Sequence, residues 1–329
     1  MKWPASSLCG LVGWRRLAAC CVGLWWWLGG GVQVGASGVE LTGSMPLTPA
    51  PDYFGTRPMG MGNAGVALAD GTEALFINPA GAWRRRKSYV LEGTFFFHPA
   101  ADNRVFNIGI IDSKSNPMVA GGASYSYYMS PRQDDGKLRT IDGHIARLGV
   151  AAAWQETLVF GATLKYLYLN RPFFAPINTL TLDVGVTWQT TSWLSMSVVG
   201  YNLIYNETGE TPISMAIGIA IGHKMPFQLA VDWVIDFQSK GGGEVGHELR
   251  AGAEYTILNV VSIRLGYQLD QVRDFVGLNE TEKRIRHFLS VGVGVQYAQF
   301  GAQIAFRQQL ALNYESNNRH LAFSLQAFF

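Results

Sequence analysis

Histidines are the side chains of this chain best suited to acid–base or nucleophilic chemistry. The six of them stand at positions 98, 144, 223, 247, 287 and 320, and none lies in a nucleophile motif. A hydrolase needs a serine, a histidine and a carboxylate or amide that converge in space. His320 and Ser324 share one face of a predicted strand, but residues four apart in a strand are separated by about 13 Å, beyond hydrogen-bond reach. The sequence therefore predicts no catalytic residues and no enzyme.

Charged side chains form a second set, and they occupy alternate positions in segments whose other positions are apolar. Such positions point the same way in a β-strand, because side chains alternate between its two faces. Two roles are open to them: opposite charges can pair across an interior and stiffen it, or a charge can contact a substrate. Their mixed signs argue against a strongly ion-selective pore, which favours a ring of one sign. The set comprises Arg147, Lys165, Asp183, Asp232, Asp236, Glu248, Arg250, Glu254, Arg264, Asp270 and Arg307.

The segments that carry these charges have the period of two expected for strands with one apolar and one polar face. In residues 178–190, Leu and Val alternate with Thr and Asp, and the same alternation recurs at 227–238, 261–270 and 286–297. Strands of about ten residues, apolar outside and polar inside, are typical of transmembrane β-barrels. A charge that faces lipid at mid-depth costs about 2–4 kcal/mol, so the charged set is expected in the lumen or at the rims.

About fourteen strands follow from this pattern, and short connections alternate with longer ones. Bacterial barrels have short periplasmic turns, longer external loops and an even number of strands. An open sheet edge would leave backbone groups unpaired in lipid, so the sequence predicts a closed, all-β, antiparallel transmembrane barrel over residues 88–329. Two of the longer predicted loops are 130–139 and 271–283. The strands are expected to begin near Ser88, Asn103, Pro117, Thr140, Thr157, Asn178, Trp193, Pro212, Pro226, Gly246, Val261, Arg284, Ala298 and Arg319.

The first 36 residues have the features of a secretory leader. A positively charged start precedes an apolar core at 17–28, and the small residues Val-Gly-Ala at 34–36 suit a signal peptidase, so we expect cleavage near Ala36. A membrane anchor is the alternative, but glycines at 29–31 limit the apolar run to about a dozen residues, too short to span a bilayer. No apolar run long enough for a spanning helix follows the leader.

Removal of the leader changes which chemistry the mature chain can perform. All three cysteines, at 9, 20 and 21, lie within it, which excludes disulfides and thiolate metal sites from the mature protein. Three of the 26 basic residues also leave, so 23 remain against 24 acidic ones. This near-neutral balance gives no reason to expect nucleic-acid binding. We expect no metal and no cofactor.

The aromatic residues and the final strand also fit an outer-membrane barrel. The last strand ends on Phe329, and a terminal aromatic on an amphipathic strand resembles the signal read by the barrel-assembly machinery, which is therefore an expected partner during biogenesis. Aromatic side chains gather at predicted strand ends, as in interfacial girdles. Trp154, Trp188 and Trp193 flank short turns, whereas Tyr125, Tyr127, Tyr166 and Tyr168 approach long loops.

Residues 37–87 precede the first strand and do not have the barrel pattern. They contain five prolines and a glycine-rich run at 55–71. A barrel of fourteen strands is wide enough to need filling or to conduct water. Irregular backbone at membrane depth must be buried in protein. We therefore predict that residues 37–87 form a hatch that plugs the lumen.

A motif within this segment resembles a known family. The run from Gly55 to Asp70, Gly-Thr-Arg-Pro-Met-Gly-Met-Gly-Asn-Ala-Gly-Val-Ala-Leu-Ala-Asp, is followed by Glu-Ala-Leu-Phe-Ile-Asn-Pro-Ala-Gly at 73–81. Together they resemble the amino-terminal hatch of the FadL family of outer-membrane channels, and they are nearer still to its PorV/PorQ-like branch. The Asn-Pro-Ala triplet at 78–80 is the specific part of the motif.

The resemblance implies a fourteen-stranded, integral outer-membrane channel for long-chain fatty acids or other hydrophobic small molecules, in contact with membrane lipid. Substrate would enter from outside, shift the hatch and leave laterally through a gap in the wall. On this resemblance Phe76, Asn78, Pro79 and Ala80 are candidates for the hatch region that governs passage. The alternative is that they form a structural turn that seats the plug.

A second function stays open beside passive uptake. In the PorV-like branch the barrel serves as a scaffold in protein export or surface attachment, which implies a secreted or surface protein as partner. The longest external loops here are about a dozen residues, shorter than the ligand-gathering loops of fatty-acid channels. Only residues 172–177 offer an apolar patch in them, where Phe173 and Phe174 could dock a lipid or a partner, or fold onto the rim.

A basic run, Arg-Arg-Arg-Lys at 84–87, joins the hatch to the first strand. It could hold an acidic lipid headgroup or an acidic partner. The plainer interpretation is a solvated periplasmic junction between the plug and the barrel.

Overall fold

The computed structural model of the chain describes residues 54–85, 88–99, 102–134, 137–170, 176–204, 211–223, 225–237, 245–275, 281–310 and 318–329. The expected cleavage near Ala36 lies outside these residues, as do Phe173 and Phe174. No helix in these ranges is both long and apolar enough to cross a membrane.

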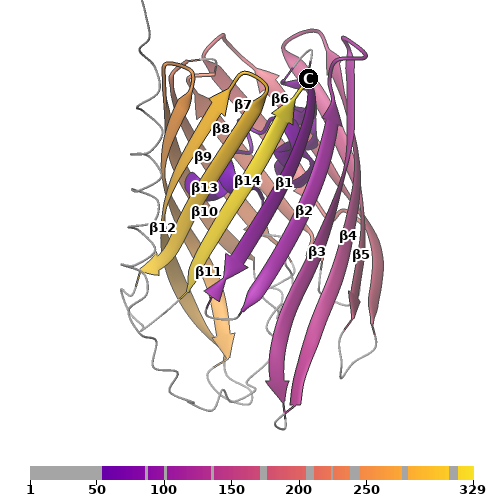
Figure 1. Cartoon of the computed structure of the whole chain (residues 1–329), viewed down its shortest axis with the longest axis vertical. Helices are drawn as coiled ribbons and strands as arrows, with labels where there is room; N and C mark the ends of the chain where they lie inside the picture. Colours follow the sequence, from indigo (N-terminus) through magenta and orange to yellow (C-terminus); the bar gives the residue numbers. More distant parts are fainter. Residues whose placement is uncertain are drawn as a thin grey trace, which may run out of the picture. The chain divides into compact units, whose positions relative to one another are not determined.

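Fourteen strands form a closed antiparallel barrel in which each strand pairs with its neighbours in sequence (Figure 1). The last strand closes the ring on the first, with Val90 opposite Phe328. Closure pairs the first strand with the last, so the sheet has no free terminal strand, as a lipid environment demands. The strands are β1 (Tyr89–His98), β2 (Asn103–Asp112), β3 (Val119–Asp134), β4 (Lys137–Trp154), β5 (Leu158–Asn170), β6 (Ile177–Gln189), β7 (Leu194–Tyr201), β8 (Ser214–Ile221), β9 (Phe227–Asp236), β10 (Gly246–Ile257), β11 (Val261–Phe275), β12 (Thr281–Tyr297), β13 (Phe300–Leu310) and β14 (Arg319–Phe328).

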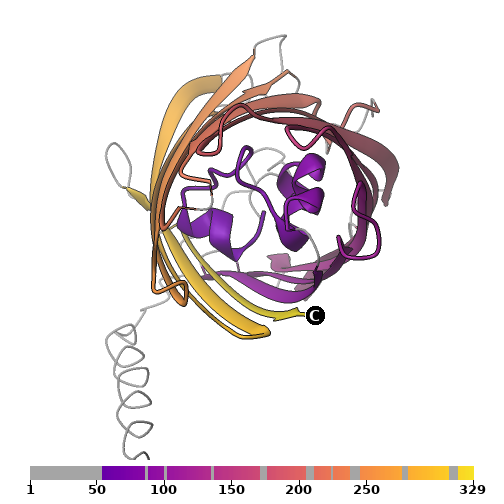
Figure 2. The same ribbon diagram turned by 90° about the horizontal axis from the view of Figure 1, so that it is seen from above.

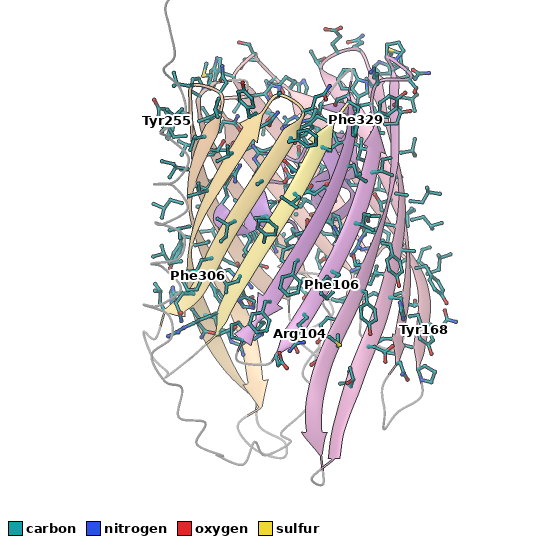
Figure 3. All side chains as sticks on the ribbon, viewed as in Figure 1. Arg104, Phe106, Tyr168, Tyr255, Phe306 and Phe329 are labelled. Carbon is teal, nitrogen blue, oxygen red and sulfur yellow. The ribbon has the colours of Figure 1, made fainter. Side chains whose placement is uncertain are left out.

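Polar inward and apolar outward side chains alternate along the strands of the wall, as the sequence predicts. In β6, Thr181, Asp183 and Thr187 are buried in the lumen, whereas Leu180 and Trp188 are exposed on the outer face. Figure 3 shows side chains that project outward from the strands in view, among them Phe106 on β2, which is exposed. An apolar outer face with a polar interior is the arrangement of a transmembrane barrel, and the predicted fold class is confirmed.

Predicted and observed strand starts differ by three residues at most. The largest differences occur at β4, which begins at Lys137 rather than Thr140, and at β12, which begins at Thr281 rather than Arg284.

Two predicted loops are wrong. Residues 130–139 and 271–283 are largely strand, since β3 runs to Asp134 and β11 to Phe275, in register with β4 and β12. The backbones of these strand ends are paired, but their sequences do not alternate apolar with polar residues. The period-two signal therefore stops before the strand does.

The segment before the barrel lies inside the ring, as the short dark helices within the circle of strands show (Figure 2). We refer to residues 54–85 as the plug. It comprises α2 (Thr56–Gly60), η1 (Gly71–Glu73), α3 (Ala74–Ile77) and η2 (Pro79–Trp83). Its apolar side chains, among them Val66, Leu75 and Ile77, are fully buried and pack against the inner wall. The main apolar core of the protein is therefore the contact between plug and barrel.

Glycines in the wall let the plug backbone approach the strands directly. Gly161 of β5 lies opposite Gly185 of β6, and a Cβ on Gly161 would stand 2.2 Å from the amide nitrogen of Ala80. Gly252 of β10 and Gly266 of β11 form a second facing pair, where a Cβ on Gly266 would stand 1.9 Å from the nitrogen of Gly62. The plug is seated on these two glycine pairs, because any side chain there would displace its backbone.

Candidate functional site

Two cavities flank the plug, one toward each end of the barrel. The loop-end cavity lies near the connections β7–β8 and β9–β10, has a volume of about 80 Å³ and opens to solvent. The turn-end cavity lies near the short turns and the end of β14 and has a volume of about 270 Å³. The plug separates them, with Phe54 and Phe76 facing the first and Arg57 and Glu73 facing the second.

The loop-end cavity combines aromatic and aliphatic surface with charged groups of both signs, the acidic ones being Asp236, Glu248 and Asp270. Phe54, Phe76, Tyr201 and Val234 supply the apolar lining. Arg147 and Lys165, which project inward from adjacent strands β4 and β5, supply positive charge; they lie directly opposite each other in the register. An apolar pocket with a few convergent polar groups is the usual form of a small-molecule site.

Arg147 is a buried lumen charge that forms no ion pair among the described residues. Its side chain donates to Ser126 Oγ at 2.9 Å and its guanidinium lies 4.2 Å from the centroid of the Phe76 ring. The residue is 6% exposed, and its Nε has no hydrogen-bond partner. No carboxylate among the described residues forms an ion pair with it. A buried cation in this state is suited to an anionic ligand, since removal of a charge from water is costly unless that charge is paired.

The other predicted lumen charges are mostly paired, which is the structural role that the sequence left open. Lys165 contacts Asp183 at 2.7 Å, Arg250 contacts Glu248, and Arg264 contacts Glu254. Asp236 lines the loop-end cavity together with Asp270. These three pairs stiffen the inner wall.

The Lys165–Asp183 ion pair lies where the hydrogen-bonded ladder between β6 and β7 ends. Asn202 joins it by accepting from Lys165 Nζ at 2.6 Å and donating its backbone N–H to Asp183 Oδ1 at 2.8 Å. Asn202 has φ 55°, a left-handed conformation that Asn tolerates better than most residues. It turns the chain away just after β7 ends at Tyr201. The ladder between β6 and β7 therefore stops at Val184, and the loop-end half of β6 has no β7 partner.

A buried ion cluster links the plug to the opposite wall. Arg57 of α2 holds both oxygens of Glu254 at 3.1 Å and contacts Glu73 at 2.9 Å and Gln228 at 3.1 Å. Arg264 of β11 binds the same Glu254. Burial opposes the charge of Arg57, but the carboxylates of Glu254 and Glu73 raise its pKa well above the ordinary value. Burial raises the pKa of Glu73 to about 7, against the opposing charge of Arg57.

Asp232 anchors the middle of the plug. Its Oδ2 accepts from the backbone N–H groups of Gly65 and Val66 at 2.6 and 2.9 Å, and the residue is fully buried. Successive backbone N–H groups form a concave anion site, so the carboxylate holds this turn of the plug without a side-chain partner.

The four predicted hatch residues occupy two different environments. Phe76 faces the loop-end cavity, whereas Asn78, Pro79 and Ala80 lie against the glycine pair of β5 and β6. Asn78 donates to Val66 O at 2.7 Å and Thr187 Oγ1 at 2.9 Å, and accepts from the Ala80 amide at 3.1 Å. The structure thus brings the triplet to the wall and only Phe76 to the cavity.

We expect Asn78→Leu to loosen the plug while the barrel still assembles. The change removes three buried hydrogen bonds, and each buried polar group left unpaired costs about 1–3 kcal/mol. Uptake should therefore change while the folded fraction, measured by heat-dependent gel mobility, stays the same. Asn178→Leu, on the exposed outer side of β6, is the matched control. Equal loss of folding and uptake would make Asn78 a purely structural residue.

The basic run after the plug lies at the turn end. Arg84 donates to Ala67 O and to Gln189 Oε1, and Arg85 lies 3.7 Å from Asp70 and 4.5 Å from the Phe328 ring centroid. The last two residues of the run, 86 and 87, are outside the described ranges. Arg84 and Arg85 thus contact both plug and barrel, as a junction requires.

Three residues of the site were not selected from the sequence. Arg57 and Glu73 lie within the quoted hatch motif, and Asn202 follows a predicted strand. Arg57 and Glu73 could have been identified from the sequence, because both are charged residues in a segment predicted to be buried. A buried charge needs a partner.

Comparison with known proteins supports the fold. No family model matches the sequence, and no curated protein matches it. Among solved structures, the CymD monoaromatic hydrocarbon channel has a TM-score of 0.59 at 12% identity, covering 83% of this chain and 96% of that one. A Pseudomonas aeruginosa FadL homologue has a TM-score of 0.60 at 12% identity, covering 83% and 97%. The Ralstonia pickettii toluene transporter TbuX has a TM-score of 0.58 at 11% identity, covering 84% and 99%.

These likenesses establish a shared fold. The predicted resemblance to FadL-type barrels is confirmed at that level. The nearness to the PorV/PorQ-like branch stays a prediction.

Proposed function

We propose that this protein is an outer-membrane channel for the passive uptake of hydrophobic small molecules, and that long-chain fatty acids or similar amphipaths with an anionic end are its preferred cargo. The observation that carries the proposal is the loop-end cavity, where apolar surface meets a buried arginine without a counter-ion. Proteins of the same fold include a monoaromatic hydrocarbon channel and a toluene transporter, which supports hydrophobic cargo.

The two cavities support a route that starts at the loop end. A hydrophobic molecule finds apolar lining at Phe54, Phe76 and Val234. Beyond the plug, the turn-end cavity is lined by ion pairs and by four glutamines, at 228, 296, 303 and 326, which offer little to an apolar molecule. Lateral exit into the membrane avoids that polar surface.

The wall at β6 and β7 is our candidate for the lateral exit. The ladder there stops at Val184, and only single contacts continue it, such as Leu203 N–H to Leu182 O at 2.8 Å. Leu203 and Ile204 are exposed on this side and present apolar surface at the break. Opening this seam would require far fewer backbone hydrogen bonds to break than opening a full ladder.

Uptake by proteoliposomes tests the function directly. Vesicles with and without the protein are given a panel of fatty acids and of neutral compounds such as toluene, and accumulation is followed over time. We expect the protein to accelerate entry of fatty acids most strongly. Entry rates equal to those of protein-free vesicles across the whole panel, with no uptake defect in a deletion strain, would refute the channel.

The scaffold alternative is distinguished by native mass spectrometry of the protein extracted gently from its own outer membrane. Bound apolar molecules without a protein partner are the result that we expect. A stoichiometric protein partner without a ligand would favour the scaffold. A partner captured by crosslinks at Phe173 or Phe174 would point the same way.

A further inference from the structure

The turn-end cavity is lined by two buried polar atoms that have no hydrogen-bond partner among the described residues. They are Nη1 of Arg264 on β11 and Oε1 of Gln303 on β13. Arg264 is 6% exposed and Gln303 is 9% exposed, so both side chains are largely withdrawn from bulk solvent. A buried polar group that stays unpaired is costly. Both atoms are therefore suited to a molecule that enters the cavity.

The register of the wall places these two side chains on adjoining parts of its inner face. Gly294 of β12 pairs with Gln303 of β13. A Cβ on Gly294 would stand 3.0 Å from Nη1 of Arg264, so the guanidinium fills the space over this glycine. Neighbouring strands are about 4.8 Å apart, which makes Gln303 the next inward side chain along the wall. A hydroxyl group both donates and accepts, so one hydroxyl can serve the free donor and the free acceptor together.

The charged side chains in the described lining of this cavity balance one another. They are three basic and three acidic residues: Arg57, Arg85, Arg264, Asp70, Glu73 and Glu254. Each arginine forms an ion pair with at least one of the acids, for example at 2.9 Å between Arg57 and Glu73. A charged ligand would bring in a charge without a counter-ion, which is costly in a buried site. The lining therefore favours a neutral ligand.

The uncharged polar side chains of the cavity are amides and hydroxyls. They comprise Thr72, Gln228, Thr256, Asn259, Ser262, Gln296, Gln303 and Gln326. A side-chain amide offers two donors and an acceptor, and a hydroxyl offers one donor and accepts as well. Thr72 belongs to the plug, whereas Gln228 and Gln326 belong to β9 and β14, so these groups converge from several sides. Such a lining matches a ligand that carries several hydroxyl groups.

The size and position of the cavity limit the ligand further. Its volume of about 270 Å³ lies near the lower end of the range for ligand pockets, which starts at about 300 Å³. Val90 and Phe328 add some apolar surface for a carbon skeleton. The cavity lies at the end with the short turns, which faces the periplasm in bacterial barrels. A small, soluble molecule from the periplasm fits these limits.

We propose that the turn-end cavity is a binding site for a neutral polyhydroxylated molecule, a sugar of one or two rings, in which Arg264 and Gln303 hold one hydroxyl between them. The ligand contacts the plug at Thr72 and the wall at Arg264 and Gln303. This site differs from the loop-end cavity in place and in ligand chemistry. The inference therefore goes beyond the proposed uptake of hydrophobic molecules and does not depend on it.

Equilibrium dialysis of the folded protein against radiolabelled sugars tests the site. The protein is kept in a detergent without a sugar headgroup, and the probes are glucose and sucrose, with glucuronate as the charged analogue of glucose. We expect saturable binding of at least one neutral sugar and at least tenfold weaker binding of glucuronate. A long-chain fatty acid should not compete with the bound sugar.

Two glutamine variants test the assigned contacts. Gln303→Leu removes the free acceptor with little change in volume and should weaken sugar binding tenfold or more. Gln296 is exposed at the edge of the cavity, so Gln296→Leu leaves the packing intact and should weaken binding several-fold. Gln308→Leu, on the outer face of the same strand as Gln303, is the matched control and should bind like the unaltered protein. Heat-dependent gel mobility verifies that each variant contains a folded barrel.

The absence of saturable binding for both neutral sugars would show that the cavity holds water only, and would overturn the proposal. Equal affinity for glucose and glucuronate would overturn it too, as would unaltered binding in both Gln303→Leu and Gln296→Leu. Because dialysis uses no hydrophobic compound, a failed sugar site and a failed channel give different results. The first appears in dialysis and the second in uptake by proteoliposomes.

Discussion

Gly161→Val should convert the plugged barrel into an open pore. A Cβ at Gly161 would stand 2.2 Å from Ala80 N and 2.3 Å from Pro79 C, distances at which the plug backbone must move. Overpacking of a well-packed core costs about 1–3 kcal/mol. At about 1.4 kcal/mol per tenfold, the ratio of seated to displaced plug should fall about 5- to 150-fold. The expected result is a large, continuous ion conductance in planar bilayers.

The barrel itself should tolerate this change, because the new side chain points into the lumen and the outer face is untouched. Gly93→Val is the matched control: a Cβ there meets nothing within 4 Å. We expect the control to conduct like the unaltered protein. If Gly161→Val also stays closed while folded, the plug is not seated on the glycine pair.

Sequence periodicity predicted the barrel because the two faces of each strand meet different solvents. Residues 178–190 show this most clearly, with every second side chain apolar, and β6 occupies almost the same span. Periodicity does not predict the ends of β3 and β11, because the sequences there do not alternate apolar with polar residues although the strands are paired. Backbone pairing, which periodicity does not report, extends the strands there.

The site was harder to predict than the wall that surrounds it. Inward parity located Arg147 and Lys165 correctly in the lumen, but parity cannot distinguish a charge that is paired from one that is not. That distinction depends on which strand lies opposite and on where the plug is placed. Arg147 lies next to Phe76 rather than an acid because the plug delivers an aromatic ring to that position.

The role of the glycines in the wall also depends on contacts that the sequence alone does not reveal. In the sequence, Gly161 and Gly185 interrupt strands and appear only to weaken them. In the structure they face each other and receive the Asn-Pro-Ala triplet of the plug. The sequence contained both halves of this contact, but only the register of β5 and β6 brings them together.

Arg147→Met should change the selectivity of uptake more than its overall rate. A hydrogen bond to a charged group contributes about 1.5–3 kcal/mol, so loss of the guanidinium should slow entry of a fatty acid about 10- to 100-fold. Entry of a neutral compound such as toluene should be unaffected. Methionine is the suitable replacement because it is flexible and packs well against an aromatic ring, here Phe76. Competition between a labelled fatty acid and toluene in proteoliposomes measures the ratio.

Lys165 lies beside Arg147 but gives a less specific test. It is paired with Asp183 and Asn202, so Lys165→Met would leave a buried carboxylate unpaired at the break between β6 and β7. Both cargo classes should then be affected through the wall. Arg147 has no such carboxylate to abandon, and Arg104→Met serves as its exposed control. If fatty acid and toluene entry fall equally in Arg147→Met, the arginine supports the plug through Phe76 and does not bind the anionic end of the cargo.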